Sequence, residues 1–254
     1  MLVEAALPNF LKLLSHGLRW QILRALAGSD LRVQELVQAV NQPQNLVSYH
    51  LQQLRKRGIV QEHRSISDGR EIYYSLDLDQ VRRLYFASGG ELHPALSGVA
   101  VPAVEQQESL PAVRILFLCT QNSARSQMAE GIIRSRSRGR IAAFSAGTEP
   151  SKVHPLAIRV LEEMQIDIRH HRSKSMEEYL DQKFDYIITV CDRAREACPV
   201  FPGDPIKIHW SFPDPSAVQG SENEKYSAFR ETAIQLNTRI GYLLLVLNRG
   251  GEAG

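Results

Sequence analysis

The chain has 254 residues and a mass of 28.6 kDa, enough for one large domain or two modest ones. Hydrophobic residues make up 43% and charged residues 23%, as in ordinary soluble globular proteins, and a net charge of +2 does not by itself predict nucleic-acid binding. No segment approaches the roughly 18 apolar residues that span a bilayer, and the N-terminal residues lack a basic export signal. Together with an odd count of three cysteines, these features predict a protein of the reducing cytoplasm with no membrane partner.

The first part of the chain has the pattern of a small helical module. Apolar residues recur on one face of two predicted helices, which contain Leu18, Ile22 and Leu26, and Leu36, Val37 and Val40. A third helix begins near Pro43, where the missing N–H costs little, and ends at Gly58. Its apolar face holds Val47, Leu51 and Leu54 at positions i, i+4 and i+7.

Two β-like runs follow the third helix, at residues 59–63 and 71–76. The Asp68-Gly69 pair between them is typical of a hairpin turn. A winged helix-turn-helix has this order of elements: helix, helix, turn, polar-faced helix and hairpin. The module resembles the ArsR-type repressor family, and the segments that carry the resemblance are Leu18–Leu26, Val47–Leu54, Arg57–Val60 and Tyr73–Leu76.

The resemblance implies that the third helix enters the major groove of a DNA operator and that the hairpin contacts the backbone. Amide and arginine side chains can read base edges, and arginines can pair with phosphates. The candidate DNA-binding residues are Gln44, Asn45, Ser48, Tyr49, Gln52, Arg55, Arg64 and Arg70. The alternative is a solvated helix face used for packing or dimerisation. A homodimer is expected from the family, with the segment Gln80–Ser88 as one candidate contact.

The module departs from its family in one respect. Many members sense metalloids through cysteines in the DNA-binding part, but residues 1–90 contain no cysteine. Direct thiolate sensing of arsenite in this half is therefore not expected, and the effector, the operator and the direction of regulation stay open.

The segment from residue 89 to residue 111 is the candidate linker. It contains Gly89-Gly90, Pro94 and Pro102, and its periodicity is lost. We therefore expect a DNA-binding domain at residues 1–88 and a second domain at residues 112–250.

The second domain alternates strand and helix patterns. Short apolar runs predict strands at residues 113–118, 141–144, 186–190 and 206–210, and helical patterns follow the first run and occupy residues 154–164 and 222–248. This alternation predicts a three-layer α/β domain with a four-stranded parallel sheet. Ligands of such sheets bind at the carboxyl ends of strands, where Cys119 lies.

Cys119 opens a candidate oxyanion-binding loop between the first strand and its helix. Backbone N–H groups and the helix N-terminus can hold an anion, and we expect the same field to lower the pKa of Cys119 and make it a nucleophile. Arg125 can hold two oxygens of a tetrahedral oxyanion, Ser126 can hydrogen-bond the sulfur, and Asn122 can hold the shape of the loop. The expected oxyanion-binding residues are Thr120, Gln121, Asn122, Ser123, Ala124 and Ser126.

Asp214 is the candidate proton donor for a leaving oxygen, because Asp214-Pro215 follows the last predicted strand. This half resembles the low-molecular-weight tyrosine phosphatase fold and, within it, the thioredoxin-coupled arsenate reductases. The residues that carry the resemblance are Cys119–Gly131, Ser145–Gly147, Val190-Cys191, Cys198-Pro199, His209-Trp210 and Asp214-Pro215. Ala124 and Ser216 stand where phosphatases of this fold tend to have cysteine and tyrosine.

The resemblance to the reductases implies a relay of three thiols. Cys119 attacks arsenate, Cys191 then attacks Cys119, and Cys198 closes a 191–198 disulfide that thioredoxin reduces. If residues 191–198 were helical, the two Cα atoms would lie roughly 10 Å apart, whereas a disulfide needs them within about 7 Å. We therefore expect this segment to unwind on oxidation; the alternative is a pair of inert thiols.

Some of these reductases bind a monovalent cation, and this chain departs from their pattern. Asn122, Glu130 and Ser145 match that site, but Lys174 stands where an acidic ligand is expected, so its ammonium group can replace the ion and no metal or bound cofactor is predicted. We thus expect a DNA-binding transcriptional regulator fused to an arsenate reductase, with phosphate as a competing oxyanion. The alternatives are a tyrosine phosphatase fused to a DNA-binding domain, and a regulator whose phosphatase-like domain senses oxyanions or redox state.

Overall fold

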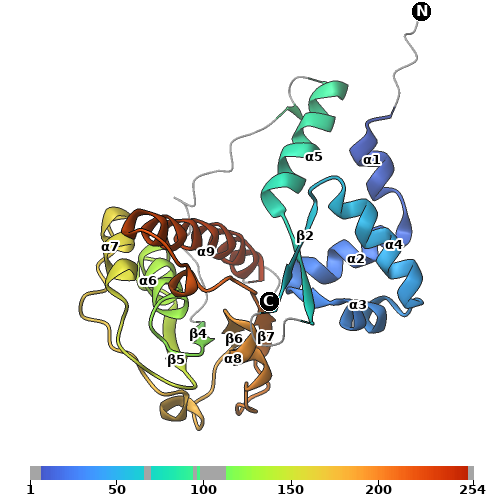
Figure 1. The fold of residues 1–254 in the computed structure, drawn as a ribbon. Coiled ribbons are helices and arrows are strands. Elements are labelled where there is room, and N and C mark those ends of the chain that lie inside the picture. The colour runs from blue at the N-terminus through green and yellow to red at the C-terminus, as the bar shows by residue number, and fades with distance from the viewer. Residues whose placement is uncertain (1–6, 66–69, 94–95, 98–112, 251–254) are drawn as a thin grey trace, which may run out of the picture. The chain divides into compact units, whose positions relative to one another are not determined.

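The computed structural model describes residues 7–65, 70–93, 96–97 and 113–250 (Figure 1). The chain divides into two compact units, Met1–Gln106 and Gln107–Gly254. Each unit has its own cluster of buried apolar side chains, and each is described by itself below.

The N-terminal unit is built on four helices that share one core. They are α1 (Asn9–Leu14), α2 (Gly17–Gly28), α3 (Val33–Val40) and α4 (Gln44–Arg55). The apolar faces expected from the sequence point inward, and Ile22, Leu36 and Leu54 are fully buried. Burial of this shared face holds the short helices together, because such helices are marginal on their own.

Helix α4 begins and ends where the sequence predicted. Pro43 is its N-cap residue. At the other end Gly58 adopts a φ of 67°, and its N–H donates to Arg55 O at 2.8 Å. A side chain would strain this left-handed conformation, so the glycine ends the helix and turns the chain into the next strand.

A three-stranded antiparallel sheet completes the helix-turn-helix region. Its order is β1 (Leu31–Arg32), β3 (Ile72–Leu76) and β2 (Val60–Arg64). The predicted hairpin is β2 paired with β3, with Val60 opposite Leu76, while its Asp68-Gly69 turn lies outside the described residues. Strand β1 was not predicted, because two residues are too few for a period to be recognised.

Helix α5 (Leu78–Leu92) runs past Ser88, so its last turn occupies the beginning of the predicted linker. The side chain of Asp77 caps its start by accepting from Gln80 N at 2.8 Å. The glycines that argued for a linker instead allow a close approach: a Cβ on Gly89 would lie 2.8 Å from Leu96 O, and one on Gly90 would lie 2.8 Å from Ser97 Cβ. Residues 98–111 of the predicted linker lie outside the described residues.

The C-terminal unit contains the predicted four-stranded parallel sheet. Its order is β5 (Ala142–Gly147), β4 (Arg114–Cys119), β6 (Tyr186–Thr189) and β7 (Ile206–His209). All three pairings are parallel, with Cys119 opposite Gly147 at the carboxyl end of the two strands. The expected fold class is therefore confirmed.

Helices connect and cover these strands (Figure 1). They are α6 (Arg125–Arg136), α7 (Pro155–Glu163), α8 (Asp192–Glu196) and α9 (Glu222–Gly250), with the short 3₁₀ turns η3 (Met176–Tyr179) and η4 (Pro215–Ala217). Helix α9 packs against α6 and α7, and α8 lies against β4 and β6. The fully buried residues of the central strands, such as Phe117, form the core between these layers.

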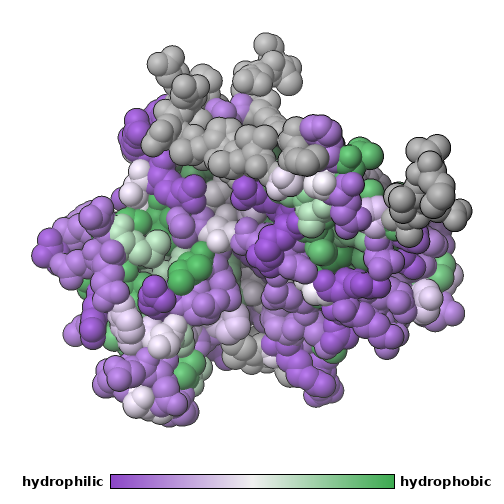
Figure 2. All heavy atoms as spheres, turned by 90° about the horizontal axis from the view of Figure 1, so that it is seen from above, coloured by the Kyte–Doolittle hydropathy of each residue, from purple (hydrophilic) through white to green (hydrophobic). Residues whose placement is uncertain are grey.

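Most of the molecular face in Figure 2 is hydrophilic, interrupted by separate apolar patches. Among the described helices, none is both long enough and apolar enough to cross a membrane.

Candidate functional site

The candidate oxyanion loop lies between β4 and α6. Strand β4 ends at Cys119 and helix α6 begins at Arg125, so the loop occupies the carboxyl edge of the sheet. Asn122 adopts a φ of 48°, which turns the loop back on itself. Gly147 at the end of β5 allows this turn, because a Cβ there would lie 2.5 Å from Thr120 O.

Cys119 is almost fully buried at the start of the loop, with 3% of its surface exposed. Its sulfur lies 2.8 Å from the hydroxyl of Ser126 and accepts the N–H of Asn122 at 3.1 Å. These contacts hold the sulfur at the centre of the loop. They match the role expected for Ser126.

The pKa of Cys119 corrects the expectation from the sequence. Burial raises the pKa of this thiol, and the nearby Cys191 raises it further, whereas Arg125 and the hydrogen bonds of Ser126 lower it. The loss of solvation thus outweighs the contributions of the favourable neighbours, because burial penalises the charged form of a thiol.

The side chain of Asn122 links the loop to the residues around it. Its Nδ2 donates to Ser126 Oγ at 2.9 Å and to Ser145 Oγ at 2.8 Å. Its Oδ1 accepts from the backbone N–H of Lys174 at 2.8 Å and from Gln127 Nε2 at 2.8 Å. The amide is thus satisfied on both sides and fixes the loop.

Glu130 carries a buried negative charge below this network. Its side chain is 3% exposed, and Lys174 Nζ lies 3.2 Å from its Oε2. Ser145 Oγ donates to the same oxygen, and Arg134 Nη2 lies 2.8 Å from Oε1. The ammonium of Lys174 therefore occupies the position next to Glu130 and Ser145, as expected from the sequence.

Arg125 and Asp214 come together above the loop although they are distant in the sequence. Arg125 Nη2 lies 2.9 Å from Asp214 Oδ2, and Arg125 Nη1 donates to Phe212 O at 2.9 Å. The other carboxylate oxygen accepts from Ser216 N at 3.0 Å and from Ser216 Oγ at 2.7 Å. The guanidinium and the carboxylate expected to bind oxyanion and supply a proton thus face one another.

The second cysteine lies beside the loop. Cys191 is buried, and its sulfur lies 3.4 Å from the hydroxyl of Thr120 in the loop. After burial, Cys191 is the second cause of the raised pKa of Cys119. All three cysteines are free thiols.

The third cysteine lies beyond helix α8. Cys198 is half-buried, and burial raises the pKa of its thiol, with Lys207 acting in the opposite direction. Because α8 covers Asp192–Glu196, most of the segment between Cys191 and Cys198 is helical. The helical condition set out from the sequence is met for Asp192–Glu196 only, because Cys191 itself has extended backbone.

Sequence reasoning assigned no role to several residues that support the loop. Gln127 is fully buried, and its Nε2 donates to Asn122 O at 3.1 Å and to Arg172 O at 2.9 Å. Its Oε1 lies 2.9 Å from His171 Nδ1, and burial lowers the pKa of His171 to about 4. The adjacent pair His170-His171 gave no signal for this role, because the contact depends on how its segment packs against α6.

The candidate DNA-binding residues all have exposed side chains. Six of them lie on α4, and Arg64 and Arg70 flank the part of the hairpin that the structure does not describe. Arg55 forms an ion pair with Glu62 of β2, so this arginine has an intramolecular partner. The other five residues on α4 form an exposed polar surface that can face a ligand; they are Gln44, Asn45, Ser48, Tyr49 and Gln52.

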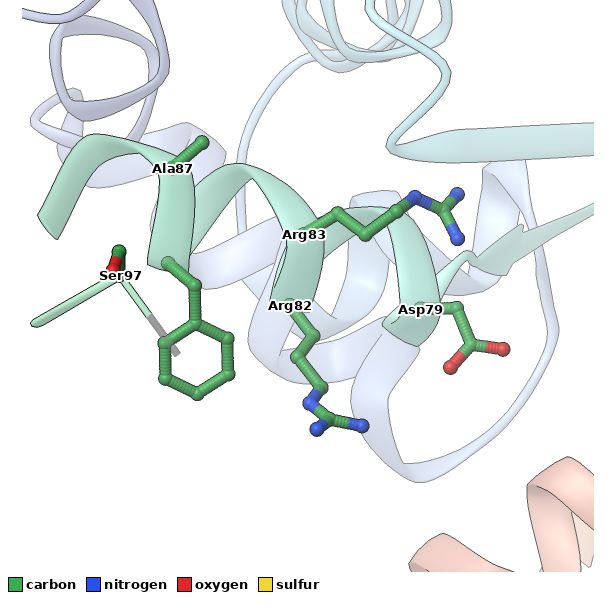
Figure 3. Close-up of a pocket in the computed structure, with 6 residues that line it drawn as sticks. Asp79, Arg82, Arg83, Ala87 and Ser97 are labelled. Carbon is green, nitrogen blue, oxygen red and sulfur yellow. The ribbon is translucent and has the colours of Figure 1, made fainter. Parts of the chain in front are cut away.

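A hollow of about 480 Å³ lies on the surface of the N-terminal unit at α5 (Figure 3). Its lining residues are Asp79, Arg82, Arg83, Phe86, Ala87 and Ser97. The guanidinium of Arg82 lies 5.6 Å from the centre of the Phe86 ring. The lining offers positive charge and an aromatic ring, and it contains no thiol.

Two family models match this chain. Residues 114–252 match the low molecular weight phosphotyrosine protein phosphatases, and residues 16–62 match the bacterial regulatory proteins of the arsR family. Both resemblances stated from the sequence are thereby confirmed.

Curated relatives match the C-terminal half. An arsenate reductase of Halalkalibacterium halodurans is 38% identical over 126 residues, which are 50% of this chain and 91% of that protein. The arsenate reductase of Oceanobacillus iheyensis is 37% identical over 138 residues, 54% of this chain and 96% of that protein. The arsenate reductase of Bacillus subtilis is 35% identical over 126 residues, 50% of this chain and 91% of that protein.

Proposed function

The chain belongs to the low molecular weight phosphotyrosine protein phosphatase family and carries an arsR-type regulatory segment, and from this we propose that it is a DNA-binding regulator fused to an arsenate reductase. Arsenate and phosphate are both tetrahedral oxyanions, so the loop binds either. The C-terminal unit reduces arsenate to arsenite, and phosphate competes for the same loop.

The first step uses the residues around the loop. An arsenate dianion displaces Asp214 from Arg125, and the guanidinium then holds two arsenate oxygens. The released carboxyl group of Asp214 then lies beside the bound oxyanion, where it can act as the proton donor. Cys119 passes its proton to the bound oxyanion and attacks arsenic. Asp214 protonates the departing oxygen, which leaves as water.

The next steps transfer two electrons. The Cys191 thiolate attacks the Cys119 sulfur, a sulfur–sulfur bond forms, and the electron pair of the broken sulfur–arsenic bond leaves with arsenic as arsenite. The Cys198 thiolate then attacks Cys191 and releases Cys119. Thioredoxin, an external dithiol, reduces the 191–198 disulfide, so no bound cofactor is needed.

One observation favours arsenate reduction over phosphate hydrolysis as the function of this unit. A second thiol, Cys191, lies at the loop, with its sulfur 3.4 Å from Thr120 Oγ1. Whether a thiol or water reaches the adduct first decides between reduction and hydrolysis. A thiol placed at the loop favours reduction.

A thioredoxin-coupled arsenate assay on the wild type and on the Cys119→Ser, Cys191→Ser and Cys198→Ser variants tests the proposal. We expect Cys191→Ser to abolish arsenate turnover and to retain slow hydrolysis of an aryl phosphate. Cys119→Ser is the matched control, because it removes the nucleophile of both reactions. Equal loss of both activities in Cys191→Ser would refute the relay.

For the N-terminal unit we propose operator binding as a homodimer, with α4 in the major groove. The exposed polar surface of α4 and the arginines beside the hairpin support this role. Fluorescence anisotropy tests this role by measuring the affinity of the protein for labelled DNA fragments that were first selected for binding to it. Gln52→Ala should weaken sequence-specific binding, and Arg64→Ala should reduce the salt dependence. An unchanged affinity in both variants would refute this assignment.

A further inference from the structure

A buried polar cluster holds the first turn of α8. Asp192, which follows Cys191 directly, accepts a hydrogen bond from the Ser211 hydroxyl at Oδ1, and His209 Nε2 lies 3.1 Å from the same oxygen. The other ring nitrogen of His209 lies 2.8 Å from Thr189 Oγ1 on the neighbouring strand. These side chains are nearly inaccessible, with exposures of 5% for Asp192, 2% for His209 and 6% for Ser211.

This cluster has no part in the steps at the Cys119 loop. Its members come from the ends of β6 and β7 and from the second residue after β7, and they converge on the start of α8. Removing one partner from a buried, hydrogen-bonded charge is strongly unfavourable. The start of α8 is therefore held firmly to the sheet.

The other end of α8 is held differently. Glu196 and Ala197 are exposed, and Cys198 is half-buried. The sulfur of Cys198 has a weak contact with Pro199 O at 3.7 Å. Residues with exposed backbone and side chains open at low cost compared with a buried network.

Disulfide formation between Cys191 and Cys198 requires movement at one of these ends. Five of the residues between the two cysteines are helical; seven residues along a helix would span roughly 10 Å, whereas a disulfide needs the two Cα atoms within about 7 Å. Opening the start of α8 would break the buried contacts of Asp192, whereas the other end has exposed residues at Glu196 and Ala197 and a half-buried Cys198. The movement at the Cys198 end is therefore favoured.

We propose that Asp192, held by His209 and Ser211, is a positioning residue that anchors Cys191 beside Cys119 while the Cys198 end of α8 unwinds toward it. This inference rests on the proposed function. In the step concerned, the Cys198 thiolate attacks the Cys191 sulfur of the Cys119–Cys191 disulfide. The new sulfur–sulfur bond joins residues 191 and 198, and the released Cys119 thiolate takes up a proton.

The chain offers a matched set of variants. Asp192→Ala removes the anchor. Asp192→Asn keeps the contacts with His209 and Ser211, because both reach Oδ1 and an amide also provides this oxygen. Arg193→Ala alters the next, exposed residue of the same helix and serves as the control. Ser211→Ala weakens the anchor while retaining the carboxylate.

Two rates are measured on the full chain. One is formation of the 191–198 disulfide after a single addition of arsenate to the reduced protein, followed by acid quench, alkylation and mass spectrometry. The other is hydrolysis of an aryl phosphate, which needs the Cys119 loop and no relay. We expect Asp192→Ala to slow disulfide formation at least tenfold and to change aryl phosphate kcat/KM less than twofold.

The remaining variants identify the cause. Asp192→Asn should recover disulfide formation to within threefold of the wild type, Ser211→Ala should slow it two- to fivefold, and Arg193→Ala should leave it unchanged. If Asp192→Ala does not fold, Ser211→Ala and Asp192→Asn still test the anchor. An anchor predicts slower disulfide formation in Ser211→Ala and nearly wild-type disulfide formation in Asp192→Asn.

Three results would overturn the anchor. The first is disulfide formation at the wild-type rate in Asp192→Ala or, if that variant does not fold, in Ser211→Ala. The second is equal slowing in Asp192→Asn and Asp192→Ala, and the third is a loss of aryl phosphate hydrolysis in Asp192→Ala that parallels the loss of disulfide formation. A wild-type protein that forms no 191–198 disulfide with arsenate would overturn the proposed function and this inference together. A wild type that does form it, with unaffected variants, would overturn the anchor alone.

Discussion

Replacing Lys174 with methionine removes one positive charge from the support of the oxyanion loop and keeps a side chain of similar length. In the folded protein the ammonium lies 3.2 Å from Glu130 Oε2, and the exposures are 11% for the lysine and 3% for the glutamate side chain. Glu130 in turn holds Ser145, which accepts a hydrogen bond from Asn122 of the loop. The substitution therefore affects both the stability of the unit and the geometry of the loop.

The magnitude follows from the partners that remain. Removing one member of a fully buried pair costs about 3 to 5 kcal/mol. Here Arg134 stays 2.8 Å from Glu130, but its side chain is 41% exposed and its contribution is screened. We therefore expect a loss of about 2 to 3 kcal/mol, close to the value of a hydrogen bond to a charged group. For a unit of this size the melting temperature should fall by roughly 5 to 10 °C.

The assay is thermal unfolding combined with arsenate turnover at several potassium concentrations, with sodium or a bulky organic cation as the counter-salt. Potassium ions can partly compensate the Glu130 carboxylate that has lost its ammonium partner, so the Lys174→Met variant should regain part of its stability and activity in potassium. The wild type should respond less than twofold. Lys152→Met alters an exposed lysine and is the control. An unchanged melting temperature, or a potassium response as large in the wild type, would refute the reasoning.

Three further predictions concern the site. Asp214→Asn removes the proton donor and should lower kcat for an aryl phosphate by about 10² to 10⁴, with a smaller effect on substrates that have good leaving groups; equal effects on both would contradict the role. Because burial raises the pKa of Cys119, its alkylation by iodoacetamide, followed by mass spectrometry, should increase only above the ordinary thiol range, and Arg125→Ala should move this profile to higher pH. A profile with a midpoint below pH 7 would show that the loop lowers the pKa after all. Burial also lowers the pKa of His171 from 6.5 to about 4, so between these values the unfolded chain binds a proton that the folded chain does not. Stability should then decrease as pH falls through this window, and chemical denaturation of His171→Asn should show a smaller decrease.

Much of the fold follows from local patterns in the sequence. The apolar period of α4, with Pro43 before it and Gly58 after it, predicted both ends of the helix correctly. The alternation of apolar runs and helical segments predicted the parallel sheet, and the position of Cys119 at the end of β4 follows from it. These features depend on residues close together in the chain, where spacing and backbone preferences are sufficient.

Other features depend on contacts that spacing does not encode. Gly89-Gly90 indicated a linker, but the segment at residues 96–97 packs against these glycines and α5 continues through them. The direction of the Cys119 pKa depends on the degree of burial and on the neighbouring Cys191, neither of which a motif reveals.

The sequence by itself determined the order of the four parallel strands and of most helices (though not α1 or β1), the Cys-x5-Arg loop between β4 and α6, and the identities of the three thiols. Only the tertiary structure brought Asp214 to Arg125, Lys174 to Glu130, and His209 and Ser211 to Asp192. The physical reason is that a buried charge is stabilised by the particular side chains packed around it. Which side chains these are is decided when the sheet and its helices come together.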